Sequence, residues 1–124
     1  HVKIDENAII GGNSAVHQFV NIGKYAMIGG MSGVENDIIP YGLYFGIRAN
    51  LRGINLIGLK RKGLNNNLIN KINYIFKKIF NKSNSIEHNI NNLESEEINI
   101  VEIKDIIMFI ESNLKRGIAS YNNG

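Results

Sequence analysis

Residues 8–16 read AIIGGNSAV and residues 26–34 read AMIGGMSGV, so six of nine positions are identical across an offset of eighteen residues. A shorter period runs through the same region, where a β-branched aliphatic residue occupies every sixth position: Ile4, Ile10, Val16, Ile22, Ile28 and Val34. The positions two places earlier hold small or medium residues: Val2, Ala8, Ser14, Val20, Ala26 and Ser32. A strand repeats every two residues and a helix about every 3.6. The period of six therefore indicates a chain that turns a corner every six residues.

Three such faces make one triangular coil, and the pattern predicts a parallel β-helix in which each aliphatic residue stacks on its equivalent in the next coil. We expect Ser14 to lie under Ser32. The pairs Gly11-Gly12 and Gly29-Gly30 suit tight turns or positions with positive φ. A meander of short strands is the alternative, but it would not keep aliphatic residues in phase over six hexads. Stacked repeats need about three units for stability, so we expect further coils upstream.

Four segments follow from the change of pattern along the chain. Residues 1–40 are predicted to form the last coils of a hexapeptide-repeat β-helix, which ends near Pro40. Residues 41–53 are predicted to be a connecting loop, residues 54–119 a small C-terminal helical domain, and residues 120–124 a tail. Apolar spacing places helices within this domain over residues 54–62, 66–81, 85–94 and 99–115.

Composition excludes several classes of site and partner. The chain has no cysteine, which excludes disulfides and thiolate zinc sites. A net charge of +3 is too small to indicate a nucleic-acid partner. No apolar run reaches the roughly 18 residues of a membrane span. No glycine loop of a nucleotide-binding type is present, and nothing in the sequence indicates a cofactor or a metal.

The histidines are the first candidates for chemistry. With a period of eighteen, His1 aligns with Phe19, so His1 and His17 are predicted to share one side of the prism on neighbouring coils. Two histidines there suit general-base work or hydrogen bonding to a substrate, or they are ordinary polar residues on a solvated face. His88 is predicted to lie on a helix surface. Lys60-Arg61-Lys62 either complements a helix dipole or binds a phosphorylated ligand.

Three segments carry a resemblance to a known family. HVKIDENAIIGGNSAVHQF (1–19), YAMIGGMSGV (25–34) and GINLIGLKRKG (53–63) resemble the C-terminal half of the UDP-N-acetylglucosamine acyltransferases. The resemblance implies a cytoplasmic bacterial enzyme of lipid A synthesis, a homotrimer of left-handed β-helices with its active site between subunits. Such an enzyme moves a 3-hydroxyacyl chain from acyl carrier protein to the 3-hydroxyl of UDP-N-acetylglucosamine. No cofactor is implied.

The resemblance also implies residue roles. The general-base histidine of the family falls about one coil before His1, so this chain alone is expected to be inactive. His1 matches an auxiliary residue that positions the sugar or acyl group, and His17 and Gln18 match a pair that contacts substrate. Gly30 matches the floor of the acyl channel, where glycine implies a longer acyl chain.

A further set of residues matches positions that hold the uridine diphosphate part: Asn55, Arg61 and Lys62. The chain departs from the best-known members at Ile57, where they have an acidic residue, and at Arg48, where they have histidine. Lys62 replaces a second arginine and loses the bidentate fork of a guanidinium. We expect Arg48 to take over part of the nucleotide contact.

Three other readings stay open at this point. A related enzyme that N-acylates an amino-sugar would share the scaffold and most motifs. A β-helix that only binds partners would explain the lack of a complete catalytic set in this chain. A β-helix carbonic anhydrase would require zinc and more histidines.

Overall fold

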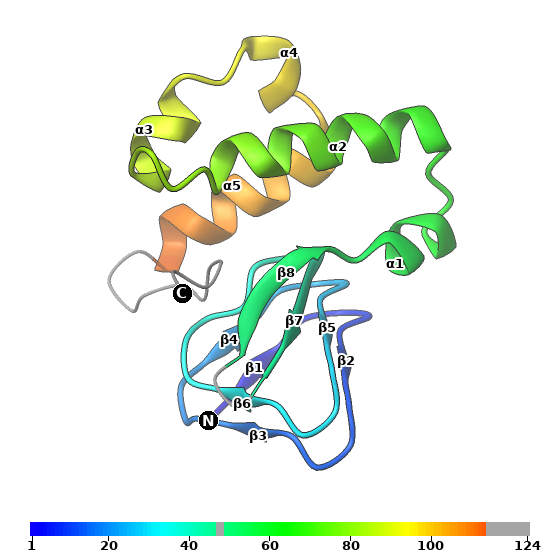
Figure 1. Cartoon of the computed structure of the whole chain (residues 1–124), viewed down its shortest axis with the longest axis vertical. Helices are drawn as coiled ribbons and strands as arrows, with labels where there is room; N and C mark the ends of the chain where they lie inside the picture. Colours follow the sequence, from blue (N-terminus) through cyan, green and yellow to red (C-terminus); the bar gives the residue numbers. More distant parts are fainter. Residues whose placement is uncertain (47–48, 114–124) are drawn as a thin grey trace.

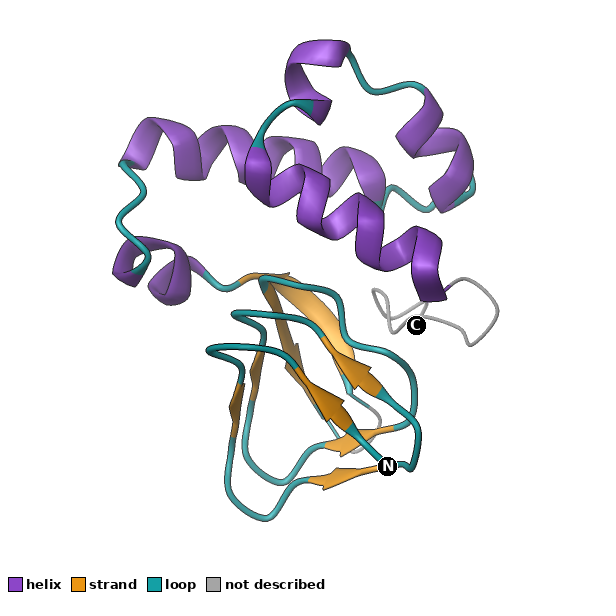
Figure 2. Ribbon diagram, turned by 180° about the vertical axis from the view of Figure 1, so that it is seen from behind, coloured by secondary structure: helices purple, strands orange, loops and turns teal. Residues whose placement is uncertain are grey.

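The computed structural model describes residues 1–46 and 49–113 of the chain. Six two-residue strands follow one another at the predicted spacing: β1 (Lys3–Ile4), β2 (Ile9–Ile10), β3 (Ala15–Val16), β4 (Asn21–Ile22), β5 (Met27–Ile28) and β6 (Gly33–Val34). Each strand pairs in parallel with the strand one coil later, so that β1 joins β4, β2 joins β5 and β3 joins β6. The result is a triangular coil, seen most clearly from behind in Figure 2.

The registers confirm the predicted stacking. Ile4 pairs with Ile22, Ile10 with Ile28, and Val16 with Val34. In the second coil all three aliphatic residues, Ile22, Ile28 and Val34, are fully buried. Ser14 also lies against its equivalent, because its Oγ accepts a hydrogen bond from Ser32 N at 3.2 Å. The hexad pattern therefore encodes a ladder of side chains inside the prism.

The corners differ from the prediction in one respect. Asn7, Asn13, Phe19, Tyr25 and Met31 have a positive φ, one at each hexad turn, and Tyr41 has one beyond them. Neither glycine pair has a positive φ. Gly12 and Gly30 do lie in tight turns. Gly11 is required for another reason, since a Cβ there would lie 2.4 Å from the nitrogen of Gly30 in the next coil. Close stacking, and not backbone conformation, selects glycine at that position.

The predicted connecting loop over residues 41–53 is wrong. Two strands occupy most of this segment, β7 (Gly42–Phe45) and β8 (Asn50–Ile54). β7 pairs in parallel with β5, and β8 pairs antiparallel with β7. Ile28 pairs with Tyr44 across sixteen residues and not eighteen, so the hexad phase breaks while the sheet continues. The buried Tyr44 takes the place of an aliphatic residue in the ladder.

The helices follow the coil: α1 (Leu56–Arg61), α2 (Asn66–Ile79), α3 (Ile86–Asn91), α4 (Ser95–Ile98) and α5 (Val101–Asn113). The four predicted helices are confirmed, the first three with shorter bounds, while the predicted end of the fourth at residue 115 lies outside the described residues. Gly63 follows α1 with a φ of +100°. Helix α4 was not predicted as a separate element; it starts at a capping box between Glu94 and Glu97. Ser85 caps α3, and its Oγ accepts a hydrogen bond from His88 N at 3.1 Å.

Helices α2 and α5 pack against each other above the open end of the hairpin (Figure 1). The apolar stripes of both helices are buried, and they join the core of the prism in one continuous cluster. The buried members are Ile69, Ile72, Ile75, Phe76, Ile79, Ile103, Ile106, Ile107 and Ile110. Arg48, Leu114 and the tail at 120–124 lie outside the described residues. None of the helices within the described ranges is both long and apolar enough to span a membrane.

Candidate functional site

The histidine corner comprises His1, His17, Gln18 and Phe19, at the turn between β3 and β4 and its equivalent before β1. Phe19 N donates a hydrogen bond to His1 O at 3.0 Å, and the two rings stack with centroids 5.4 Å apart. This contact confirms that His1 and Phe19 occupy equivalent places on neighbouring coils. His1, His17 and Gln18 are all exposed, so their side chains are available to a ligand or to another subunit.

Gly30 lies at a second corner, between β5 and β6. It is exposed, and a Cβ there would lie 3.2 Å from the carbonyl oxygen of Gly12 in the preceding coil. Its neighbour Gly29 lies against the next strand of the sheet, since an added Cβ would lie 2.4 Å from Phe45 Cδ1. A side chain at position 30 would therefore project from the outer surface of the prism.

The third corner, between β4 and β5, carries a cleft of about 490 Å³ that we call the Asn55 pocket. Its apolar lining comes from Ile9, Met27 and Ile57. Arg61 supplies the one charged side chain among the described residues that line it. An apolar wall beside a single guanidinium fits a ligand that has both a flat or aliphatic part and an anionic part.

Asn55 itself is buried and holds the start of α1. Its Oδ1 accepts a hydrogen bond from Gly58 N at 3.1 Å, and its Nδ2 donates to Tyr25 O at 2.8 Å. Gly58 is needed here, because a Cβ would lie 2.5 Å from Asn55 Nδ2. The segment NLIG therefore forms an N-cap that ties α1 to the coil. Asn55 also lines the pocket.

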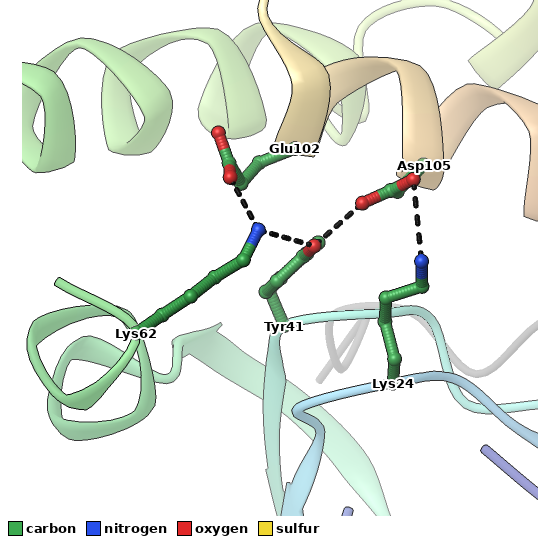
Figure 3. A network of polar contacts seen from close by, with 5 residues as sticks. All are labelled: Lys24, Tyr41, Lys62, Glu102 and Asp105. Atoms are coloured by element: carbon green, nitrogen blue, oxygen red, sulfur yellow. Dashed lines mark hydrogen bonds and ion pairs between the residues drawn. The ribbon is translucent and has the colours of Figure 1, made fainter. Parts of the chain in front are cut away.

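Lys62 does not line the Asn55 pocket. Its Nζ lies 2.5 Å from Glu102 Oε2 on α5 and donates to Tyr41 OH at 3.3 Å. Tyr41 OH in turn donates to Asp105 Oδ2 at 2.5 Å, and Lys24 pairs with Asp105 at 3.5 Å. Figure 3 shows these five residues as one chain of contacts between the coil and α5. We call it the Tyr41 network.

Burial and the contact with Asp105 raise the pKa of Tyr41 far above its usual value. The hydroxyl therefore stays protonated, and it can donate to Asp105 while it accepts from Lys62. Sequence reasoning missed this network. Its members are distant in the chain, and Lys62 is the one member that belongs to a motif of the sequence.

The structure thus separates the predicted site residues. His1, His17 and Gln18 lie at one corner, Gly30 at a second, and Asn55 with Arg61 at the third. Lys62 faces the helical domain, and Arg48 lies outside the described residues. Within the described part of the chain, no group of three or more His, Asp or Glu side chains is arranged to hold a metal ion.

Comparisons with known proteins identify the family of the chain. The family model described as Udp N-acetylglucosamine O-acyltransferase, domain 2, matches residues 37–119, which is more than half of the chain. The acyl-[acyl-carrier-protein]–UDP-N-acetylglucosamine O-acyltransferase of Sinorhizobium fredii is 38% identical over 124 residues, which are 100% of this chain and 46% of that protein. The corresponding Rhizobium rhizogenes protein is 36% identical over the same shares. The chain spans about half the length of these relatives.

The solved structures that match the chain belong to the same family. The Arabidopsis UDP-N-acetylglucosamine acyltransferase matches with a TM-score of 0.87 and 31% identity, over 98% of this chain and 44% of that one. The Acinetobacter baumannii structure matches with a TM-score of 0.86 and 36% identity, over 96% and 46%. These matches confirm the predicted left-handed parallel β-helix followed by helices. The chain belongs to the UDP-N-acetylglucosamine O-acyltransferase family.

Proposed function

We propose that the whole protein transfers a 3-hydroxyacyl chain from acyl carrier protein to the 3-hydroxyl of UDP-N-acetylglucosamine, the first step of lipid A synthesis. The observation that carries the proposal is the Asn55 pocket, in which Arg61 and an apolar wall meet at the family motif NLIGLKRKG. A guanidinium suits a diphosphate because it offers planar, paired donors. The side-chain amide of Asn55, which lines the pocket, would add a directional contact to the same ligand.

The histidine corner would serve the reacting end of the substrate. In this proposal the base is a histidine about one coil before His1, outside the present sequence. It takes the proton of the sugar hydroxyl, whose oxygen attacks the thioester carbonyl of the donor. A backbone N–H stabilises the resulting oxyanion, and the thiol of the carrier protein leaves as the ester forms. His1 positions the sugar or acyl group, while His17 and Gln18 contact the substrate.

A homotrimer would join the separated corners. In a cyclic trimer one surface of each subunit meets a different surface of its neighbour. The histidine corner of one subunit can therefore face another corner of the next subunit. Large apolar side chains are exposed on the coil, including Met31 at 75% and Phe19 at 53%. Burial of such residues between subunits would stabilise the trimer. Gly30 would then floor the acyl channel in the resulting cleft.

The proposed partners are therefore acyl carrier protein, UDP-N-acetylglucosamine and two further copies of the protein. We place the enzyme in the bacterial cytoplasm, on the strength of the sequence resemblance and the bacterial relatives. This chain, without the upstream base, should not catalyse the reaction by itself.

The full-length protein should be incubated with UDP-N-acetylglucosamine and 3-hydroxyacyl carrier proteins of several chain lengths. We expect one ester product per sugar and a molar mass of three subunits by light scattering. Absence of transfer would refute the proposal. Faster transfer to an acceptor with an amine in place of the 3-hydroxyl would instead identify an N-acyltransferase.

A further inference from the structure

We propose that Lys62 acts as a positioning residue, which together with Glu102 and Tyr41 fixes helix α1 so that Arg61 faces the Asn55 pocket. The inference rests on the proposed function and deepens it, because it assigns the support of the nucleotide site to the helical domain. It differs from a direct role for Lys62 in holding the diphosphate, which the resemblance implies.

Helix α1 is anchored at both ends. At its start, Asn55 Nδ2 donates to Tyr25 O at 2.8 Å. At its end, Lys62 Nζ lies 2.5 Å from Glu102 Oε2 and also contacts Tyr41 OH (Figure 3). A six-residue helix has little stability of its own, so these tertiary contacts decide its orientation.

The rings of Tyr25 and Tyr41 connect the two anchors. They stack with centroids 5.8 Å apart, and Lys62 Nζ lies 5.7 Å from the Tyr25 centroid and 5.3 Å from the Tyr41 centroid. Tyr25 also lines the Asn55 pocket. Lys62 Nζ thus contacts the Tyr25 ring, which forms part of the wall of the pocket.

The charge of Lys62 is matched inside the molecule. Glu102 is only 5% exposed and Tyr41 is fully buried, so the ammonium group lies among polar groups that have little other solvation. Moving Lys62 toward a phosphate would leave the Glu102 carboxylate buried and unpaired, which is costly. The geometry therefore favours a fixed Lys62.

Arg61 gains its direction from this anchor. Successive residues of an α-helix point about 100° apart, since there are about 3.6 residues per turn. When Lys62 is held against α5, its neighbour Arg61 is turned away from α5, and it lines the Asn55 pocket as an exposed side chain. The end of α1 therefore directs Arg61 and the C-cap residue Lys62 to two different tasks.

Glu102→Gln separates the positioning role from direct contact by the sign of its effect. If Lys62 binds phosphate directly, Glu102 competes with the ligand, and its neutralisation leaves affinity equal or increased. If Lys62 positions α1, neutralisation of Glu102 loosens the helix and weakens binding. The matched control is Glu97→Gln, which removes the ion pair with Lys78 inside the helical domain.

The test uses the full-length protein, with the Kd for UDP-N-acetylglucosamine from calorimetry and steady-state kcat and KM. We expect Glu102→Gln and Lys62→Met each to raise Kd and KM about tenfold with little change in kcat, and the double variant to be no weaker than either single one. Glu97→Gln should stay within about twofold of wild type. Lys62→Arg should retain the binding that Lys62→Met loses, because arginine keeps a cation beside Glu102.

Equal or tighter binding by Glu102→Gln would overturn the inference, as would full additivity of the two losses. Should Glu102→Gln fail to fold, Tyr41→Phe tests the same point. This variant removes only a buried hydroxyl that cannot reach the ligand, and unchanged affinity would count against the positioning role. Failure of the wild-type protein to bind the nucleotide sugar would instead refute the proposed function.

Discussion

Gly11 lies directly against the backbone of Gly30 in the next coil, where a Cβ on Gly11 would be 2.4 Å from the Gly30 nitrogen. Gly12, the next residue, has open space at the same position. Two adjacent glycines in one motif therefore have different reasons to be glycine.

The first prediction concerns this pair. Gly11→Ala in the full-length protein should lower the free energy of unfolding by about 1–3 kcal/mol, because the methyl group forces two stacked backbones apart. Gly12→Ala is the matched control and should change it by less than about 0.5 kcal/mol. Chemical denaturation of both variants checks this, and equal losses would contradict the stacking argument.

His17 and His88 are both exposed but lie on different parts of the molecule. His17→Ala should lower kcat/KM of the intact enzyme by about 10–100-fold, the range for loss of a positioned polar contact. His88→Ala should leave it nearly unchanged, because His88 on α3 contacts Asn92 within its own helical segment. Equal effects of the two substitutions on kcat/KM would argue against the histidine corner as a substrate site.

The exposed Gly30 gives a prediction on acyl length. Gly30→Met adds a long side chain to the outer corner of the prism, and it should shift the preferred donor toward shorter acyl chains. Gly30→Ala should shift the preference less. Competition between carrier proteins with different acyl lengths measures the shift, and an unchanged preference in the Met variant would refute the channel-floor role.

Asn55 and Asn65 both cap helices, but only Asn55 also bonds to the coil beside the pocket. Asn55→Ala and Asn65→Ala should each cost about 1 kcal/mol for the lost cap, with a further loss at Asn55 from the freed Tyr25 carbonyl. Only Asn55→Ala should raise KM for the nucleotide sugar. Denaturation curves and steady-state kinetics separate these two effects. A similar rise in KM for Asn65→Ala would show that helix stability, and not the pocket, sets affinity.

The ion pair between Lys78 and Glu97 predicts a pH dependence. The hydrogen bond from Lys78 holds the pKa of Glu97 below its ordinary value of 4.5. A lowered carboxyl pKa contributes stability that is complete above the ordinary value and is lost as the pH falls through the lowered one. Wild type should therefore lose more stability than Glu97→Gln between neutral pH and pH values below 4.5. Melting temperatures across that range measure the difference, and parallel curves would contradict it.

The coil could be predicted from sequence because its signal is local and repeated. Ile4, Ile10 and Val16 follow one another at intervals of six residues. The same spacing also gives their partners in the next coil, eighteen residues later. The segment 41–53 could not be predicted in this way. Its pairing to β5 depends on a sixteen-residue offset and on the buried Tyr44, and neither belongs to the hexad pattern.

Part of the candidate site could likewise be predicted from local motifs, and part could not. The motifs AVHQF and NLIGLKRKG locate the histidine corner and the Asn55 pocket on the chain, and the positions of His1 and Phe19 follow from the period alone. The Tyr41 network could not be found from the sequence, because Lys24, Tyr41, Lys62, Glu102 and Asp105 meet only after α5 packs on the coil.

By itself, the sequence determined an eighteen-residue coil with a corner every six residues, the helices that follow it and the motifs at its corners, since periodic burial and local capping act over a few residues. Only the tertiary structure decided that the motif residues occupy three different corners and that Lys62 faces α5 while Arg61 faces the pocket. The physical reason is that a buried carboxylate such as Glu102 must be paired, and its partner is chosen by the packing of elements forty residues apart in the chain.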